Sequence, residues 1–195
     1  SSGSVMAPPR KQRVLNIYPQ TTPSPNDPPG ADKFYLALGV ATMAWGRLEN
    51  NFVACLMIVM QITKDGHSSR KHPMKWERQA IIWKDAFARI PSLKSHEKDA
   101  AAFLAEFGNM SEDRNLLIHG FWEDFHPRPP LTVNLLHIKA LSGTADGIGI
   151  RRVPIRIDQL EQFAGKANKL NMEITKLGQT LSLLQGPPLP DAQIL

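Results

Sequence analysis

The sequence predicts a mainly α-helical protein: a bundle of four or more helices with a β-hairpin inserted before the last long helix. Two observations lead to this fold class. Apolar residues recur at alternating spacings of three and four along much of the chain, which is the repeat of helices that pack along a seam. Between residues 131 and 157 this repeat gives way to short β-branched runs separated by turn residues, a pattern typical of a hairpin.

Length and composition favour one ordinary globular domain. The chain has 195 residues, of which 42% are hydrophobic and 21% charged. Its single cysteine, Cys55, excludes a disulfide within the chain and favours a reducing, cytoplasmic location. No apolar run reaches the 18 residues of a membrane span, and no leader peptide is evident, so we expect no membrane partner.

The two ends of the chain differ from its middle. Residues 1–30 are rich in proline and poor in apolar residues, so they cannot bury enough surface to offset their ordering entropy. We expect a disordered arm there and a flexible tail over 186–195, with the helical domain over 31–185. Of the net charge of +5, the arm carries +2, which leaves a domain too weakly basic to indicate nucleic acid by itself.

Four segments carry helical repeats. The first, from about 31 to 60, has an apolar seam with spacings of four and three: Phe34, Leu38, Ala41, Trp45, Leu48, Phe52, Cys55 and Val59. A shorter helix is predicted over about 74–89, with Pro91 just beyond its end.

The third repeat runs from about residue 95 to His119, and its apolar stripe continues to Phe121. Gly108-Asn109 could split this helix. The last helix should extend to about Leu184, because its heptad seam is unbroken and Asp158 with Glu161 has the spacing of a capping box.

The predicted hairpin occupies about 131–157. Its strands are expected over 132–139 and 148–156, with the turn residues Ser142-Gly143 and Asp146-Gly147 between them. Pro154 places the second strand at a sheet edge or near its own end, because proline cannot donate to a sheet ladder.

Polar residues interrupt the apolar stripe at the end of the third helix, in the stretch EDRNLLIHGFW over residues 112–122. Arg114 occupies a seam position, and Asn115 lies one helical turn before His119 on the same face. Arg114 and His119 are five residues apart, which places them about 140° apart around a straight helix. One copy of the helix therefore does not point both side chains the same way, and a second copy could complete the site.

The residues alone leave two interpretations of Arg114 open. A seam arginine must have an anionic partner, because an unpaired buried charge is costly. That partner could be a carboxylate of the chain, either nearby or elsewhere, in which case the role is structural. It could instead be a phosphate, in which case the role is functional.

Arg114-Asn115-x-x-x-His119 resembles the R-x4-6-H signature of HEPN domains, which often place asparagine directly after the arginine. The long first helix with Trp45-Gly46-Arg47-Leu48-Glu49, and the order of His119-Gly120-Phe121-Trp122, strands and a final helix, are also similar to bacterial members. The resemblance covers about 31–184.

The resemblance implies a metal-independent endoribonuclease that forms a homodimer with a composite active site. His119 would be the acid–base residue when a ribose 2′-hydroxyl attacks the adjacent phosphate, Arg114 would bind that phosphate, and Asn115 would orient either partner. Members of this type include toxins and antiviral effectors, so RNA and an antitoxin protein are the implied partners. Other members are non-catalytic, which keeps a helical interaction or nucleotide-binding module as the alternative.

Basic residues gather in two other places and are candidates for RNA binding because phosphate contacts dominate nucleic-acid affinity. They are Lys64, Arg70, Lys71, Lys75 and Arg78 after the first helix, and Arg151 and Arg152 on the hairpin. Trp76 lies within the first group and could stack on a base. A solvated loop with Trp76 in the core is the alternative.

We expect no cofactor and no metal site. Glu123-x-x-His126 has a metal-ligand spacing, but it lies before Pro127, outside a helix, and lacks a second copy. No Walker sequence or complete dinucleotide fingerprint occurs in the chain.

Overall fold

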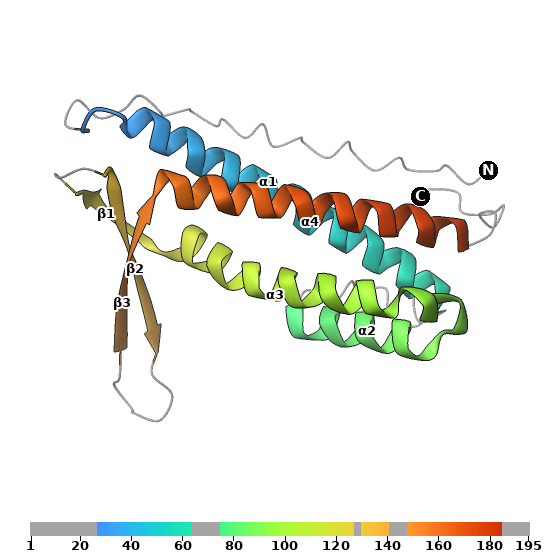
Figure 1. Cartoon of the computed structure of the whole chain (residues 1–195). Coiled ribbons are helices and arrows are strands. Elements are labelled where there is room, and N and C mark those ends of the chain that lie inside the picture. The colour runs from blue at the N-terminus through green and yellow to red at the C-terminus, as the bar shows by residue number, and fades with distance from the viewer. Residues whose placement is uncertain (1–26, 64–74, 127–129, 141–147, 185–195) are drawn as a thin grey trace, which may run out of the picture.

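The structure is a computed structural model of the chain, and it describes residues 27–63, 75–126, 130–140 and 148–184. Side chains are described for these residues except 137–140 and 148. Within these ranges the chain forms four α-helices, one 3₁₀ helix and a three-stranded sheet (Figure 1). The predicted mainly helical fold class is therefore confirmed. The predicted arm up to residue 26 and the tail from residue 185 lie outside the described residues.

The two longest helices form the central pair of the bundle. α1 (Ala31–Ile62) and α4 (Ile157–Leu184) pack side by side along much of their length (Figure 1). The predicted seam of α1 is buried, apart from Leu38, which is partly buried. On α4 the seam is buried from Leu160 to Leu181, with Leu177 partly covered, whereas Leu184 at its end is exposed. Heptad spacing therefore identified the packing faces of both helices.

A helical hairpin packs against this pair. α2 (Trp76–Arg89) is followed by the 3₁₀ helix η2 (Pro91–His96) and by α3 (Glu97–His119). Pro91 ends α2 and starts η2, as expected from its fixed φ and missing N–H. The third helix is not split at Gly108-Asn109.

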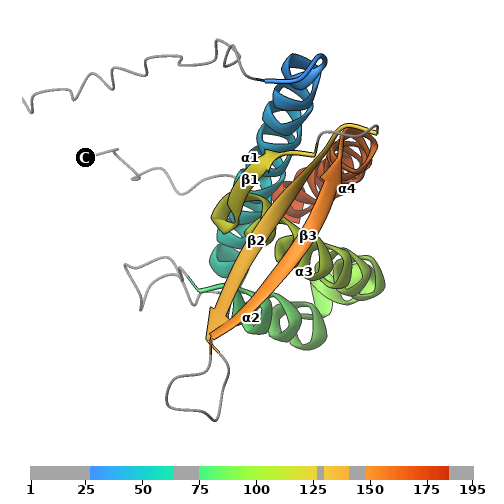
Figure 2. The ribbon, with the colours of Figure 1, turned by 90° about the vertical axis from the view of Figure 1, so that its left-hand side faces the viewer.

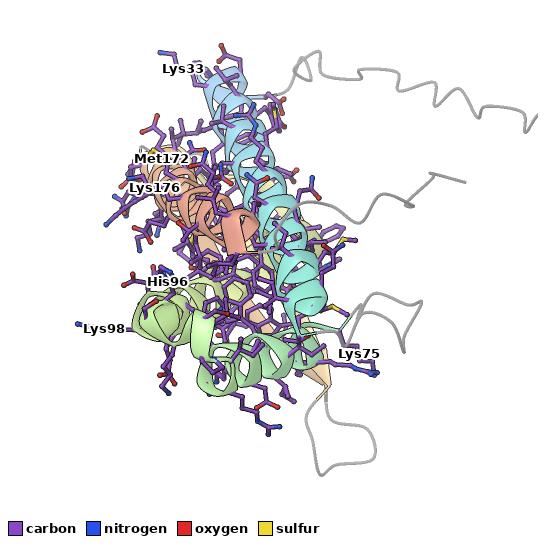
Figure 3. All side chains as sticks on the ribbon, turned by 90° about the vertical axis from the view of Figure 1, so that its right-hand side faces the viewer. Lys33, Lys75, His96, Lys98, Met172 and Lys176 are labelled. Carbon is purple, nitrogen blue, oxygen red and sulfur yellow. The ribbon has the colours of Figure 1, made fainter. Side chains whose placement is uncertain are left out.

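Aromatic rings fill the space between the helices. The indole of Trp45 on α1 has its ring centre 4.8 Å from Phe107 of α3 and 6.1 Å from Phe163 of α4. Phe52 contacts Phe103 and Phe107 in the same layer. Viewed along the bundle, side chains occupy its interior, while lysines such as Lys98 and Lys75 point outward (Figure 3). These rings join α1, α3 and α4 into one core.

The sheet lies across the end of the bundle where α3 stops (Figure 2). It consists of β1 (Phe121–Phe125), β2 (Thr132–Ala140) and β3 (Ile148–Arg156), antiparallel in the order β1-β2-β3. The predicted hairpin corresponds to β2 and β3. The first strand was missed, because Phe121 continues the heptad spacing of α3. In the structure Phe121 belongs to β1 and is 67% exposed, so its assignment to the helical stripe was wrong.

Gly120 explains why the helix ends before Phe121. Its φ of −71° and ψ of 146° are extended, and its N–H still donates to the carbonyl of Leu116 at 2.9 Å. A Cβ at this position would lie 2.5 Å from that same carbonyl oxygen. The turn from α3 into β1 therefore requires a residue without a side chain.

The start of α4 differs from the predicted capping box. The helix begins at Ile157, one residue before Asp158, and the Asp158 carboxylate accepts two hydrogen bonds of 2.9 Å from the Arg156 guanidinium. These hydrogen bonds from Arg156 lower the pKa of Asp158. The backbone N–H of Arg156 instead donates to the side chain of Gln159 at 2.9 Å. The Asp158 carboxylate, which the capping box would have used, therefore pairs with the neighbouring Arg156.

Gly178 offers a test of the α1–α4 packing. A Cβ there would lie 2.6 Å from Cys55 Sγ, which donates to the Ile174 carbonyl at 3.4 Å. Gly178→Ala is expected to lower the free energy of unfolding by about 1–3 kcal/mol, because the thiol must move or the helices must separate. Denaturant unfolding measures this change.

Gly165→Ala is the matched control on α4, since no atom beyond its chain neighbours and the nearby backbone of its own helix lies within 4 Å of its added Cβ. This control should be neutral or stabilising by up to about 1 kcal/mol through helix propensity. Adding Cys55→Ala should remove most of the cost of Gly178→Ala. Equal effects of the two glycine substitutions would contradict the close approach.

Candidate functional site

The three residues of the predicted catalytic motif lie in the last two turns of α3, beside the sheet. Arg114 is partly buried, with 26% of its side chain exposed, whereas Asn115 and His119 are both exposed. His119 is the last residue of the helix, directly before Gly120. Its imidazole is thus open to solvent and is not enclosed in the core of the chain.

Arg114 has a carboxylate partner on α1. Its Nη2 lies 3.7 Å from Oε2 of Glu49, and its Nη1 donates to Oδ1 of Asn115 at 3.0 Å. The Nε atom of Arg114 is buried and has no hydrogen-bond partner within the described part of the chain. The seam arginine therefore has the anionic partner that its position demands, and the partner is an acid distant in sequence.

Trp45, in the buried core, makes a hydrogen bond to the Glu49 carboxylate. Its indole Nε1 donates to the same oxygen of Glu49 at 3.2 Å, one helical turn apart on α1. Trp45 is 2% exposed, while the Glu49 side chain is 45% exposed. The chain of contacts from Trp45 through Glu49 and Arg114 to Asn115 leads from the buried core to the surface. We call it the Trp45–Asn115 relay.

The arginine and the histidine of one chain do not meet. Within the described ranges, Arg114 makes no hydrogen bond or ion pair with His119. Their five-residue separation on an unbroken helix accounts for this. One chain therefore presents an arginine and a histidine on different faces of α3.

A cleft of about 640 Å³ lies next to this site, between α3, β3 and the start of α4. Its walls are mainly apolar and include Leu117, Ile155 and Phe163, while Glu112, Asp113 and Arg151 supply charge. Neither Arg114 nor His119 lines it. The predicted catalytic residues thus lie outside this cleft, at the C-terminal end of α3.

The predicted RNA-binding residues fall into three groups. Lys75 and Arg78, at the start of α2, are exposed, and Lys75 points away from the bundle (Figure 3). Arg151 and Arg152 on β3 are also exposed, at the end of the bundle where α3 stops (Figure 1). Lys64, Arg70 and Lys71 lie outside the described residues.

Carboxylates neutralise part of the basic surface on the hairpin. Arg152 Nη2 lies 3.0 Å from Oε1 of Glu123 on β1, and Arg156 pairs with Asp158. Arg151 projects to the other face of β3, as alternation along a strand requires, and lines the cleft beside α3. The hairpin arginines thus do not form one positive patch.

Trp76 is part of the aromatic core. Its ring stacks on Phe107 with a centroid distance of 4.9 Å and an interplanar angle of 28°. It also contacts Phe52. The suggestion that Trp76 stacks on a base is therefore replaced by the alternative, in which it packs inside the bundle.

Among the described residues no group of three or more His, Cys, Asp or Glu side chains is arranged to hold a metal ion. Cys55 is buried, and desolvation raises the pKa of its thiol to about 11, so it remains a neutral packing residue. No helix in the described ranges has the length and apolar character needed to cross a bilayer.

Sequence reasoning missed the role of Glu49, although the signal was present. Glu49 is one of only two acidic residues between Ala31 and Ile62, and it lies one turn beyond the seam tryptophan. An acid beside the seam of one helix and an arginine within the seam of another are natural partners. The sequence alone does not show how α1 and α3 pack together, and this information was needed to predict the contact.

Comparisons with protein-family models, with curated proteins and with solved structures find no match to this chain.

The Glu49–Arg114 pair should contribute little to stability. Both side chains are partly exposed and their atoms are 3.7 Å apart. In a double-mutant cycle of Glu49→Ala and Arg114→Met, we expect a coupling free energy of unfolding of about 1 kcal/mol or less. Denaturant unfolding of the four proteins measures it. A coupling of about 3 kcal/mol or more would instead make the pair a structural link between α1 and α3.

Proposed function

We propose that this protein is a metal-independent endoribonuclease of HEPN type. The observation that carries the proposal is the arrangement at the end of α3, where a solvent-exposed His119 lies one turn beyond an Asn115 that contacts Arg114. An imidazole titrates near neutral pH, which suits proton transfer. A guanidinium in a partly desolvated setting suits phosphate.

In the proposed reaction His119 removes the proton of a ribose 2′-hydroxyl, and the 2′ oxygen attacks the adjacent phosphorus. The bond from phosphorus to the 5′ oxygen breaks, and that oxygen takes a proton from solvent. The products are a 2′,3′-cyclic phosphate and a 5′-hydroxyl end. Arg114 stabilises the charge that develops on the phosphoryl oxygens, and Asn115 orients the guanidinium that it contacts.

The proposed active form is a homodimer. Because Arg114 and His119 of one helix diverge, the site needs Arg114 of one protomer with His119 of its partner. Apolar side chains next to the histidine support burial of this surface against a second copy: Ile118 is 42% exposed and Phe121 67% exposed. RNA is the proposed substrate, with Lys75, Arg78 and Arg151 as further phosphate contacts.

The biological role that we propose is that of a cytoplasmic toxin or phage-defence effector. Such an enzyme must be silent until needed, and an antitoxin protein that covers the exposed end of α3 would achieve this.

A non-catalytic interaction module is the second candidate. One observation favours it: Glu49 already supplies a carboxylate to Arg114 within the chain, so the arginine does not require phosphate. The exposed acids Glu112 and Asp113 beside it also oppose RNA. In this case Arg114 would join α3 to α1, and its loss would change stability more than activity.

Cleavage of a labelled RNA in EDTA separates the two candidates. The wild type should cleave without metal and leave cyclic-phosphate ends, whereas Arg114→Ala and His119→Ala should each lose about 10²-fold or more in rate. His96→Ala, at a partly buried position, and Arg89→Ala, at an exposed one, are controls outside the motif and should retain activity. No cleavage by the wild type, or full activity of His119→Ala, would contradict the enzymatic proposal.

A further inference from the structure

We infer that Glu49 is a positioning residue of the proposed ribonuclease site, which holds the Arg114 guanidinium in the orientation that receives the phosphate. The inference rests on the proposed function and extends it to a residue outside the R-x4-H motif. It starts from the Trp45–Asn115 relay, in which one carboxylate oxygen accepts the buried indole N–H and lies beside Arg114.

The carboxylate is held in place by the core. Trp45 packs between Phe107 and Phe163, and its N–H points to Oε2 of Glu49 at 3.2 Å. A glutamate that is hydrogen-bonded to a buried indole of the same helix has fewer accessible rotamers than a free surface glutamate. The Glu49 carboxylate can therefore hold a group that contacts it in a defined position.

Two of the three guanidinium nitrogens of Arg114 contact other side chains. A guanidinium has five N–H donors. Within the described part of the chain, Nη1 donates to Asn115, Nη2 approaches Glu49, and Nε is buried without a partner. These two contacts orient the group. One N–H of Nη1 remains for an anion, and Nη2, which is too far from Glu49 for a hydrogen bond, keeps both of its own. Arg114 can thus bind a phosphate without releasing Glu49.

In this arrangement Glu49 orients the guanidinium of Arg114. If the carboxylate were absent, the guanidinium would keep only its contact with the exposed Asn115. Misplacement of a charge-stabilising group by about 1 Å can cost about 10²-fold in rate. Loss of Glu49 should therefore lower kcat more than it raises KM, because Arg114 acts mainly on the transition state.

The first experiment compares RNA cleavage by wild type, Glu49→Ala and Glu49→Gln, with Glu106→Ala as a control of equal charge change on the exposed face of α3. In Glu49→Ala we expect kcat to fall about fivefold, the change that a coupling of about 1 kcal/mol allows, with KM changed less than about twofold. Glu49→Gln should keep more activity than Glu49→Ala, because its amide oxygen still accepts from Trp45 and stays beside Arg114 although its charge is lost. Equal activity of Glu49→Ala and wild type, or tighter RNA binding in Glu49→Ala, would overturn the inference.

The second experiment needs no RNA and separates failure of the inference from failure of the proposed function. Proton–nitrogen NMR of the wild-type protein should show restricted Arg114 Nη signals, assigned by their loss in Arg114→Lys. These signals should average in Glu49→Ala and persist in Glu49→Gln. Restricted signals together with no wild-type cleavage would refute the ribonuclease but leave the anchoring intact. Unchanged signals in a folded Glu49→Ala would refute the anchoring itself.

Discussion

Trp45 connects the packing of the bundle to the polar end of α3. Its ring lies between Phe107 and Phe163, and so joins α1 to both α3 and α4. Its N–H must be satisfied because the residue is 2% exposed, and Glu49 accepts that hydrogen bond. The same carboxylate partners Arg114. Trp45 thus takes part both in the packing of the core and in the placement of the Arg114 guanidinium.

Local patterns in the sequence predicted most of the helical architecture. Alternating spacings of three and four identified the buried faces of α1 and α4, because helix packing is repetitive and needs only neighbouring residues. The same rule failed at Phe121, where a glycine without room for a Cβ ends α3 and a strand begins. The capping box predicted from Asp158 and Glu161 was also not realised, since α4 begins one residue before Asp158 and its carboxylate pairs with Arg156.

The candidate site was predicted in part. The motif residues were chosen for their resemblance to the R-x4-6-H signature, and their division into two faces followed from helix geometry. The position of Glu49 beside the seam was visible in the sequence, but its contact with Arg114 was not predicted, since it joins residues 65 positions apart and depends on how α1 crosses α3. Such a crossing is a property of the packed core and not of either helix. The stacking of Trp76 on Phe107 was one of two interpretations for the same reason.

The central claim is that Arg114 of one protomer acts with His119 of another. Mixing the inactive variants Arg114→Ala and His119→Ala tests it most directly, because half of the random dimers then contain one intact pair. The account predicts recovery of about a quarter of wild-type RNA cleavage after subunit exchange. A mixture as inactive as either variant alone, with exchange confirmed by labelled subunits, would contradict it.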